Sequence, residues 1–204
     1  MAQKELPEIK VILLGEPAVG KTSIIKRFHE DSFDEYEVSS ITMSYVDKTI
    51  EIDNKKYKLI IWDTIGQEKY RSISKLFLNE AKIVILVYSI EMKNSFTNLD
   101  FWYNLCHEEL GDDPVLGIAG NKSDLYQIQT VSEKEGKEYA ESKGAIFSEI
   151  SAKDNKESIN SFITSLVEAY LKKNKQEIKE IKDKIKLDKK NEKPSKKGCC
   201  GKDN

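Results

Sequence analysis

The chain has 204 residues, enough for one domain with a well-buried core, and its 39% hydrophobic and 33% charged residues indicate a globular protein with a high charge content. No apolar run approaches the ~20 residues needed to cross a bilayer, and residues 1–8 lack the apolar stretch of a secretory signal. The net charge of −2 divides unevenly: residues 171–204 hold 13 Lys against 6 Asp and Glu, whereas residues 1–170 hold 20 basic and 29 acidic side chains. The acidic part is a poor candidate for nucleic acid, whose binding requires phosphate neutralisation, so no nucleic-acid partner is expected.

The apolar runs and the residues that break them predict one α/β domain. The expected strands cover 9–14, 44–52, 56–63, 82–89, 115–120 and 145–150, with a turn at Asn54. The expected helices cover 21–30, 68–80, 93–109, 132–143 and 155–172. This alternation favours a six-stranded, mostly parallel sheet flanked by helices, with ligands at the carboxyl ends of the strands. The expected organisation is an arm over 1–8, a domain over 9–172 and a tail over 173–204.

A glycine-flanked loop separates the first expected strand from the first helix. The backbone N–H groups of such a loop and the N-terminus of the helix suit a phosphate. The Lys21 ammonium can reach the β- and γ-phosphates, and the Thr22 hydroxyl can ligate Mg²⁺, which prefers oxygen. For this pattern alone, an ordinary turn between core elements is the alternative. The residues expected around the phosphates are Gly15, Pro17, Ala18, Val19, Gly20, Lys21, Thr22 and Ser23.

Two polar segments at later strand ends indicate guanine. Asp124 can accept hydrogen bonds from guanine N1–H and the 2-amino group, which adenine does not offer on that edge, and such a site discriminates strongly. Asn121 can bond guanine N7, and the Lys122 stem can cover one face of the ring. A second segment, Ser151, Ala152 and Lys153, follows the last strand, and the Ala152 N–H can reach O6. A polar turn is the alternative for Asn121 to Asp124 alone, while an ATPase or kinase would share only the phosphate loop.

These segments, with Asp63 to Gln67 between them, make the chain similar to the Rab type of Ras-superfamily small GTPases over about residues 8–172 and the tail. Three further stretches resemble the Rab type: Lys58 to Trp62, Lys69 to Ile73, and Leu86 to Ile90. The resemblance implies a single P-loop G domain that binds GTP, GDP and Mg²⁺ and hydrolyses GTP.

The resemblance also assigns roles to individual residues. Gln67 would be the catalytic residue that orients the attacking water, and the Gly66 N–H would contact the γ-phosphate. Phe33 would pack against the guanine. The residues expected to hold Mg²⁺ are Thr22, Ser40 and Asp63, the last through water.

Four positions depart from the family pattern. Ser40 replaces a threonine and keeps only its hydroxyl, and Thr42 replaces a permissive glycine. Ile65 places a branched side chain where a small residue is usual, and Pro17 removes one loop N–H. Because phosphoryl transfer depends on positioning, these changes predict tight nucleotide binding with slow hydrolysis. The alternative is a non-hydrolysing GTP-binding adaptor.

The Lys-rich tail predicts membrane attachment. Solvated disorder is expected for most of 173–204, although Ile178, Ile181 and Ile185 keep a helical spacing that would extend the last helix. The fourth-last residue is Gly201, so the simple prenylation signal fails, and Cys199 and Cys200 instead resemble a doubly prenylated Rab terminus. Two lipid chains give stable attachment where one does not. An unmodified, solubilising tail is the alternative.

The resemblance implies the partners and the location. The switch segments would bind an exchange factor, a GTPase-activating protein and effectors, with Val38 to Val46 and Lys69 to Phe77 read in the GTP state. The tail would meet the prenylation machinery, a lipid-extracting chaperone and a membrane surface. The expected protein is a monomeric G domain in vesicle trafficking, cytoplasmic and peripheral on the cytosolic face of an intracellular membrane. Three cysteines without a pairing framework fit that reducing compartment.

Overall fold

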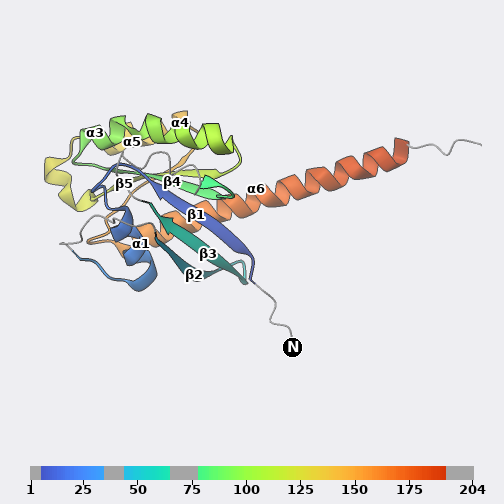
Figure 1. The fold of residues 1–204 in the computed structure, drawn as a ribbon, viewed down its shortest axis with the longest axis horizontal. Coiled ribbons are helices and arrows are strands. Elements are labelled where there is room, and N and C mark those ends of the chain that lie inside the picture. Colours follow the sequence, from blue (N-terminus) through green and yellow to red (C-terminus); the bar gives the residue numbers. More distant parts are fainter. Residues whose placement is uncertain (1–5, 35–43, 65–77, 192–204) are drawn as a thin grey trace, which may run out of the picture. The chain divides into compact units, whose positions relative to one another are not determined.

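The computed structural model describes residues 6–34, 44–64 and 78–191. Six strands form one sheet in the order β2-β3-β1-β4-β5-β6 (Figure 1). β2 pairs antiparallel with β3, and every other neighbouring pair in the sheet is parallel. The predicted six-stranded, mostly parallel sheet is therefore confirmed, and its parallel strands place their carboxyl ends at one edge.

The strands follow the expected apolar runs closely. Their bounds are β1 Glu8–Leu14, β2 Ser44–Ile52, β3 Lys55–Asp63, β4 Ile83–Ser89, β5 Val115–Asn121 and β6 Ile146–Glu149. β4 is buried along its whole length, as expected of a strand that is covered on both faces. Asp53 and Asn54 connect β2 to β3 at φ 51° and 58°, the conformation of a two-residue type I′ hairpin. The turn predicted at Asn54 is confirmed.

Helices cover both faces of the sheet. Their bounds are α1 Lys21–Glu30, α3 Lys93–Thr97, α4 Leu99–Leu110, the 3₁₀ helix η2 Ser123–Ile128, α5 Glu133–Ser142 and α6 Lys156–Asn191. Figure 1 shows α3, α4 and α5 on one side of the sheet and α1 on the other. On the first side, Trp102 and Tyr88 are the largest fully buried side chains of the core. On the opposite side, Leu166 of α6 packs so close to Gly117 of β5 that a Cβ at Gly117 would come within 2.9 Å of it.

The helix expected over 93–109 is two helices that meet at Asn98. Two hydroxyl groups bond backbone carbonyls just before this junction, and both carbonyls also accept from backbone N–H groups. Ser95 Oγ donates to the Met92 carbonyl at 2.7 Å, and Thr97 Oγ1 donates to the Asn94 carbonyl at 3.1 Å. The ψ angle of Asn98 is −1°, which tightens the chain at the junction. The helix expected over 68–80 lies mostly outside the described residues.

The last helix is longer than expected. It continues from Lys156 to Asn191, so the preference for disorder just beyond residue 172 is wrong up to that point, and the alternative of an extended helix is correct. The added length is rich in Lys, Glu and Gln, which favour helix, and contains neither Gly nor Pro before Pro194. The final residues, 192–204, lie outside the described part of the chain.

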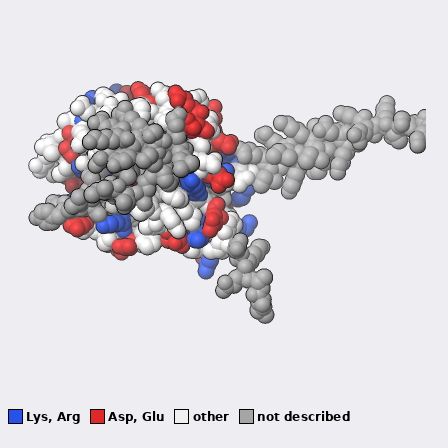
Figure 2. All heavy atoms as spheres, in the orientation of Figure 1, with Lys and Arg blue, Asp and Glu red and all other residues white. Residues whose placement is uncertain are grey.

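The chain forms two compact units, residues 1–170 and 171–204. On the face of the first unit seen in Figure 2, Lys and Arg side chains are interspersed with Asp and Glu. Within the described residues, no helix is both long enough and apolar enough to span a bilayer.

Candidate nucleotide-binding site

The predicted segments meet where the parallel strands end. The loop after β1 leads into α1, Asp63 ends β3, Asn121 ends β5, and Ser151 follows β6. Because β1, β3, β5 and β6 belong to one sheet with parallel neighbours, these ends lie along the same edge. Side chains of different segments are joined there by hydrogen bonds, so the segments form one site.

The loop between β1 and α1 has the backbone of a phosphate cradle. Gly15, Ala18 and Gly20 have positive φ angles of 147°, 62° and 94°. Alternation between left- and right-handed residues turns successive N–H groups toward one side, as in known anion-binding nests. A Cβ on Gly15 would come within 2.1 Å of the Val87 carbonyl oxygen, so only glycine fits there. The predicted loop residues Pro17 and Val19 lie in this turn as expected.

Lys21 begins α1 and is 6% exposed. Its Nζ donates to the carbonyl oxygens of Gly15 and Glu16, each at 2.9 Å. Burial lowers the pKa of Lys21 to about 8, although Asp63 and Glu16 act to raise it. A buried ammonium of this kind favours an anion beside it, since a nearby negative charge offsets the cost of removing it from water.

Thr22 and Asp63 come together from α1 and the end of β3. Thr22 Oγ1 donates to Asp63 Oδ2 at 2.8 Å, and Asp63 is 3% exposed. A hydroxyl and a carboxylate oxygen are donors that suit Mg²⁺, which binds one or two protein oxygens and completes its shell with water and phosphate. These two residues therefore fit the predicted metal site. The third predicted ligand, Ser40, lies outside the described residues, as do Thr42, Ile65, Gly66, Gln67, Cys199 and Cys200.

Asn121 joins the phosphate loop to the last polar segment. Its Nδ2 donates to the Val19 carbonyl at 2.8 Å, and its Oδ1 accepts from the Ala152 N–H at 3.2 Å. The side chain is 1% exposed. Asn121 and Ala152 were predicted to face the base separately, but the structure bonds them to each other. Asn121 is thus a brace between two segments, and its bond to guanine N7 stays a prediction.

The predicted base-recognition carboxylate is held by a neighbouring hydroxyl. Ser151 Oγ donates to Asp124 Oδ1 at 2.6 Å and accepts from the Asp154 N–H at 3.0 Å. Asp124 lies in the first turn of η2, a 3₁₀ helix that the sequence pattern did not predict. Before it, Lys122 has φ 64°, and its Nζ lies 2.8 Å from Glu91 Oε1. The Ser151 bond engages Asp124 Oδ1, and a carboxylate can accept further hydrogen bonds beside it.

Three residues that contact the predicted site residues or the phosphate loop were missed by sequence reasoning. Glu91 holds Lys122, and Trp102 Nε1 donates to Glu16 Oε1 at 3.2 Å, linking α4 to the phosphate loop. Arg27 of α1 bonds the backbone of Ala152 and Lys153. No motif marks these residues, because each acts across a large sequence separation. The predicted Phe33 is half-buried, and its ring centre lies 5.9 Å from the Arg27 guanidinium.

Comparison with known proteins agrees with this geometry. A sequence model of the Ras family matches residues 10–172. The chain is 41% identical over 149 residues to the Ras-related protein Rab-22A of Homo sapiens, which covers 73% of this chain and 77% of that protein. It is 42% identical over 147 residues to the Ras-related protein Rab-31 of Homo sapiens, covering 72% and 75% of the two chains. The Ras-related protein Rab-21 of Geodia cydonium is 42% identical over 147 residues, covering 72% and 64%. The phosphate loop, the paired Thr22 and Asp63, the carboxylate at Asp124 and these similarities together show that the chain belongs to the Rab group of the Ras family of small GTPases.

Proposed function

We propose that this protein is a GTP/GDP switch that binds guanine nucleotide with Mg²⁺, hydrolyses GTP slowly and recruits partners to a membrane in vesicle trafficking. The observation that carries the proposal is the pair of hydrogen bonds made by the Asn121 side chain. Its Nδ2 donates to the Val19 carbonyl at 2.8 Å, and its Oδ1 accepts from the Ala152 N–H at 3.2 Å. A single side chain ties the phosphate cradle to Ser151, Ala152 and Lys153, the base segment, so both can hold one molecule. The nucleotide's phosphates lie at Lys21 and its purine at Asp124.

Guanine selection rests on Asp124. The Ser151 hydroxyl fixes one carboxylate oxygen at 2.6 Å. The carboxylate then accepts from the guanine N1–H and 2-amino groups, and the Ala152 N–H lies in the segment facing O6. Adenine would leave these groups unpaired, which is the usual source of strong discrimination by a polar site.

The reaction depends on positioning and charge. Thr22 and Asp63 would hold Mg²⁺, which when bound would supply positive charge against the β- and γ-phosphates. Lys21 donates to phosphate oxygens, and Gln67 orients the attacking water with the Gly66 N–H on the γ-phosphate. Pro17 offers no N–H to the cradle, which supports a slow intrinsic rate.

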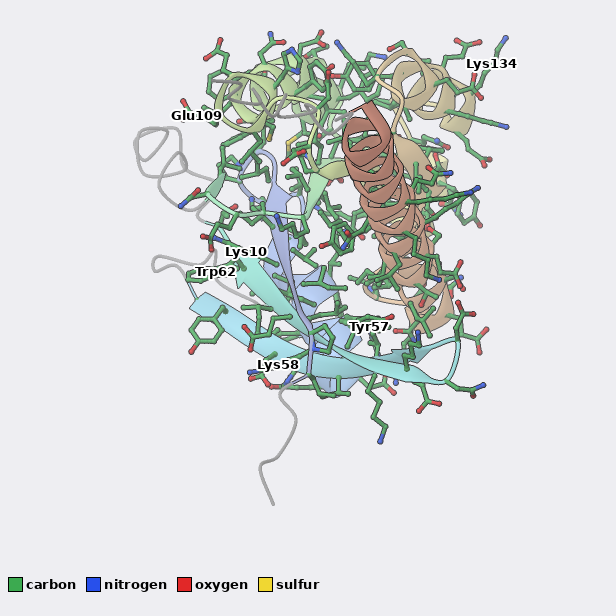
Figure 3. All side chains as sticks on the ribbon, turned by 90° about the vertical axis from the view of Figure 1, so that its right-hand side faces the viewer. Lys10, Tyr57, Lys58, Trp62, Glu109 and Lys134 are labelled. Atoms are coloured by element: carbon green, nitrogen blue, oxygen red, sulfur yellow. The ribbon has the colours of Figure 1, made fainter. Side chains whose placement is uncertain are left out.

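Partner recruitment is proposed to use the surface beside the two switch segments. Tyr45 of β2 is 59% exposed, and its ring lies 5.2 Å from the ring of Trp62 on β3. Lys10 of β1 lies beside Trp62, with its Nζ 5.1 Å from the centre of the Trp62 ring (Figure 3). An exposed tyrosine that packs on a half-buried tryptophan is the kind of aromatic anchor that protein interfaces favour. Exchange factors, activating proteins and effectors would read it together with residues 38–46 and 69–77.

Membrane attachment is proposed to use the tail. Cys199 and Cys200 would carry two prenyl chains, delivered by prenylation machinery and shielded by a lipid-extracting chaperone, while the preceding lysines meet an anionic cytosolic leaflet. The intact mass of protein purified from membranes of its native cells tests this step. An unmodified mass in that fraction would refute it.

The base assignment is tested by Asp124→Asn. Asparagine keeps one acceptor but replaces the other with an amide donor, which suits the N1–H and 2-oxo groups of xanthine. The ratio of xanthosine diphosphate to GDP affinity should rise by at least roughly 100-fold, measured by competition with a fluorescent GDP. Glu138→Gln, the same chemical change at an exposed ion pair on α5, should leave the ratio unchanged. Unaltered GDP preference in Asp124→Asn would refute the assignment.

Two further measurements test the metal and the hydrolysis. Chelation of Mg²⁺ should accelerate GDP release from the wild type and from Thr22→Ser, whereas Thr22→Val should release GDP fast with or without the chelator. Single-turnover phosphate release tests the slow rate. Hydrolysis at an ordinary small-GTPase rate without an activator would refute slow hydrolysis, and no hydrolysis even with an activating protein would favour the adaptor alternative.

A further inference from the structure

The Arg27 guanidinium bridges α1 and the base segment. Its Nε donates to the Ala152 carbonyl and its Nη2 donates to the Lys153 carbonyl, both at 2.7 Å. The arginine side chain is 17% exposed. The planar fork of arginine meets the two successive carbonyls with two separate nitrogens, a fixed geometry that the single nitrogen of a lysine ammonium does not reproduce.

Arg27 is itself held from the other side. Its Nη1 lies 3.3 Å from both the carbonyl oxygen and Oδ1 of Asp31, the residue that caps the end of α1. Asp31 Oδ2 lies 2.8 Å from Lys156 Nζ. Hydrogen bonds from Lys156 and Arg27 hold the pKa of Asp31 below its usual value. The guanidinium therefore has a defined position relative to α1 and to the backbone that it contacts.

Ala152 is bonded at both of its peptide groups. Its N–H faces Asn121 Oδ1 at 3.2 Å, and its carbonyl accepts from Arg27 at 2.7 Å. The same N–H is the group proposed to reach guanine O6. A shift of the Ala152 carbonyl away from Arg27 would rotate this short backbone segment and move the N–H with it.

The two ends of α1 serve different parts of the nucleotide. Lys21 and Thr22 begin the helix at the phosphates, and Arg27 lies in its last turn, where it bonds the base segment. Helical backbone is stiff over this length because each residue is hydrogen-bonded to the next turn. The helix thus sets the distance between the phosphate cradle and the base segment.

We propose that Arg27 is a positioning residue that places the Ala152 N–H against the 6-oxo group of the purine. This inference rests on the proposed guanine site and adds a residue to it. Arg27 does not touch the nucleotide in this assignment; it acts through the Ala152 and Lys153 carbonyls. The competing explanation is that Arg27 only joins two elements and stabilises the fold.

The test compares GDP with 6-thio-GDP at pH 7. Sulfur is a weak acceptor, so the wild type should bind 6-thio-GDP more weakly by roughly 2- to 10-fold, the effect of one neutral hydrogen bond. Arg27→Lys keeps the charge but loses the planar fork that meets the two carbonyls with two nitrogens, and its preference for GDP should fall to at most about half that of the wild type. Such a protein–ligand double cycle isolates the coupling between Arg27 and the 6-position from a general loss of affinity.

Two further variants complete the experiment. Asp31→Ala keeps Arg27 and the backbone carbonyl of residue 31 but removes the carboxylate that supports the guanidinium, and should give an intermediate preference. Lys143→Gln is the control, because it removes a similarly shielded cation from another part of the domain. The Lys143 side chain is 23% exposed, and its Nζ lies 2.9 Å from Asp100 Oδ1. This variant should keep the wild-type preference.

The outcomes separate this inference from the proposed function. If Arg27→Lys and Asp31→Ala weaken both ligands equally and keep the wild-type ratio, Arg27 is only a structural bridge and the inference is wrong. If the wild type fails to bind GDP, the proposed guanine site is wrong, and the role of Arg27 falls with it. If the wild type binds GDP tightly but does not prefer it to 6-thio-GDP, the contact between the Ala152 N–H and O6 is refuted. The inference about Arg27 is then wrong, while the proposed guanine site is not.

Discussion

Gly20→Ala is a sharp test of the brace between the phosphate loop and the base segment. Gly20 has φ +94°, and a Cβ on it would lie 2.3 Å from Asn121 Nδ2. No atom pair of this kind approaches so closely, so the Asn121 amide must leave its bond to the Val19 carbonyl at 2.8 Å. The substitution therefore breaks the contact that carries the proposed function without adding a charge or a large side chain.

The expected magnitude has two parts. A left-handed backbone costs an alanine roughly 1–2 kcal/mol relative to glycine. A buried amide that loses its partner costs about 1–3 kcal/mol more. Gly144→Ala supplies the control, because Gly144 has φ +64° and nothing lies within 4 Å of its added Cβ. The difference between the two variants is the effect of displacing Asn121: Gly20→Ala should lose about 1–3 kcal/mol more unfolding free energy than Gly144→Ala, and it should also bind GDP more weakly because the phosphate loop loses its tie to residues 151–153.

The assay follows release of a fluorescent GDP in Mg²⁺ buffer, together with the unfolding free energy from urea titration. Gly144→Ala should lose stability and keep the wild-type release rate. Gly20→Ala should lose more stability and release GDP faster. If both variants lose the same stability and Gly20→Ala holds GDP as long as the wild type, Asn121 is not the brace that we infer.

Three further predictions concern other parts of the domain. Gly15→Ala should cost more than about 4 kcal/mol of unfolding free energy and lower the thermal midpoint sharply, because its Cβ would meet the Val87 backbone oxygen at 2.1 Å; a midpoint like the wild type would contradict this. Burial raises the pKa of Cys106 to about 12, so a thiol reagent at pH 8 should label only the two tail cysteines of unlipidated protein until denaturant is added, and a third fast thiol would contradict that burial. The ion pair with Lys93 and the hydrogen bonds from Ser132 lower the pKa of Glu135 from 4.5 to about 2. The stability that ionised Glu135 contributes is therefore present above pH 4.5 and is lost as the pH falls through about 2. In urea unfolding, Glu135→Gln should differ from the wild type at pH 7 and converge with it at the acid end.

Local patterning predicted most of the fold. Runs of branched apolar residues set the strand positions, and the strand–helix alternation set their parallel pairing, as β1 and β4 show. The break at Asn98 was missed, because residues 93–110 contain no Gly or Pro that would mark it and their apolar spacing continues through it. The end of α6 was also missed: a charged helix and a solvated coil share their composition.

The amino-acid sequence by itself determined the class of site, because a phosphate cradle and a base-recognition carboxylate are short segments whose chemistry depends on neighbours within a few residues. The predictions for Lys21 and Asp124 could be made for this reason. Only the tertiary structure decided how the segments support one another. Asn121 and Val19 are 102 residues apart, and Arg27 and Ala152 are 125 apart. Contacts at such separations leave no periodic signal, since they arise only when the sheet brings the strand ends to one edge.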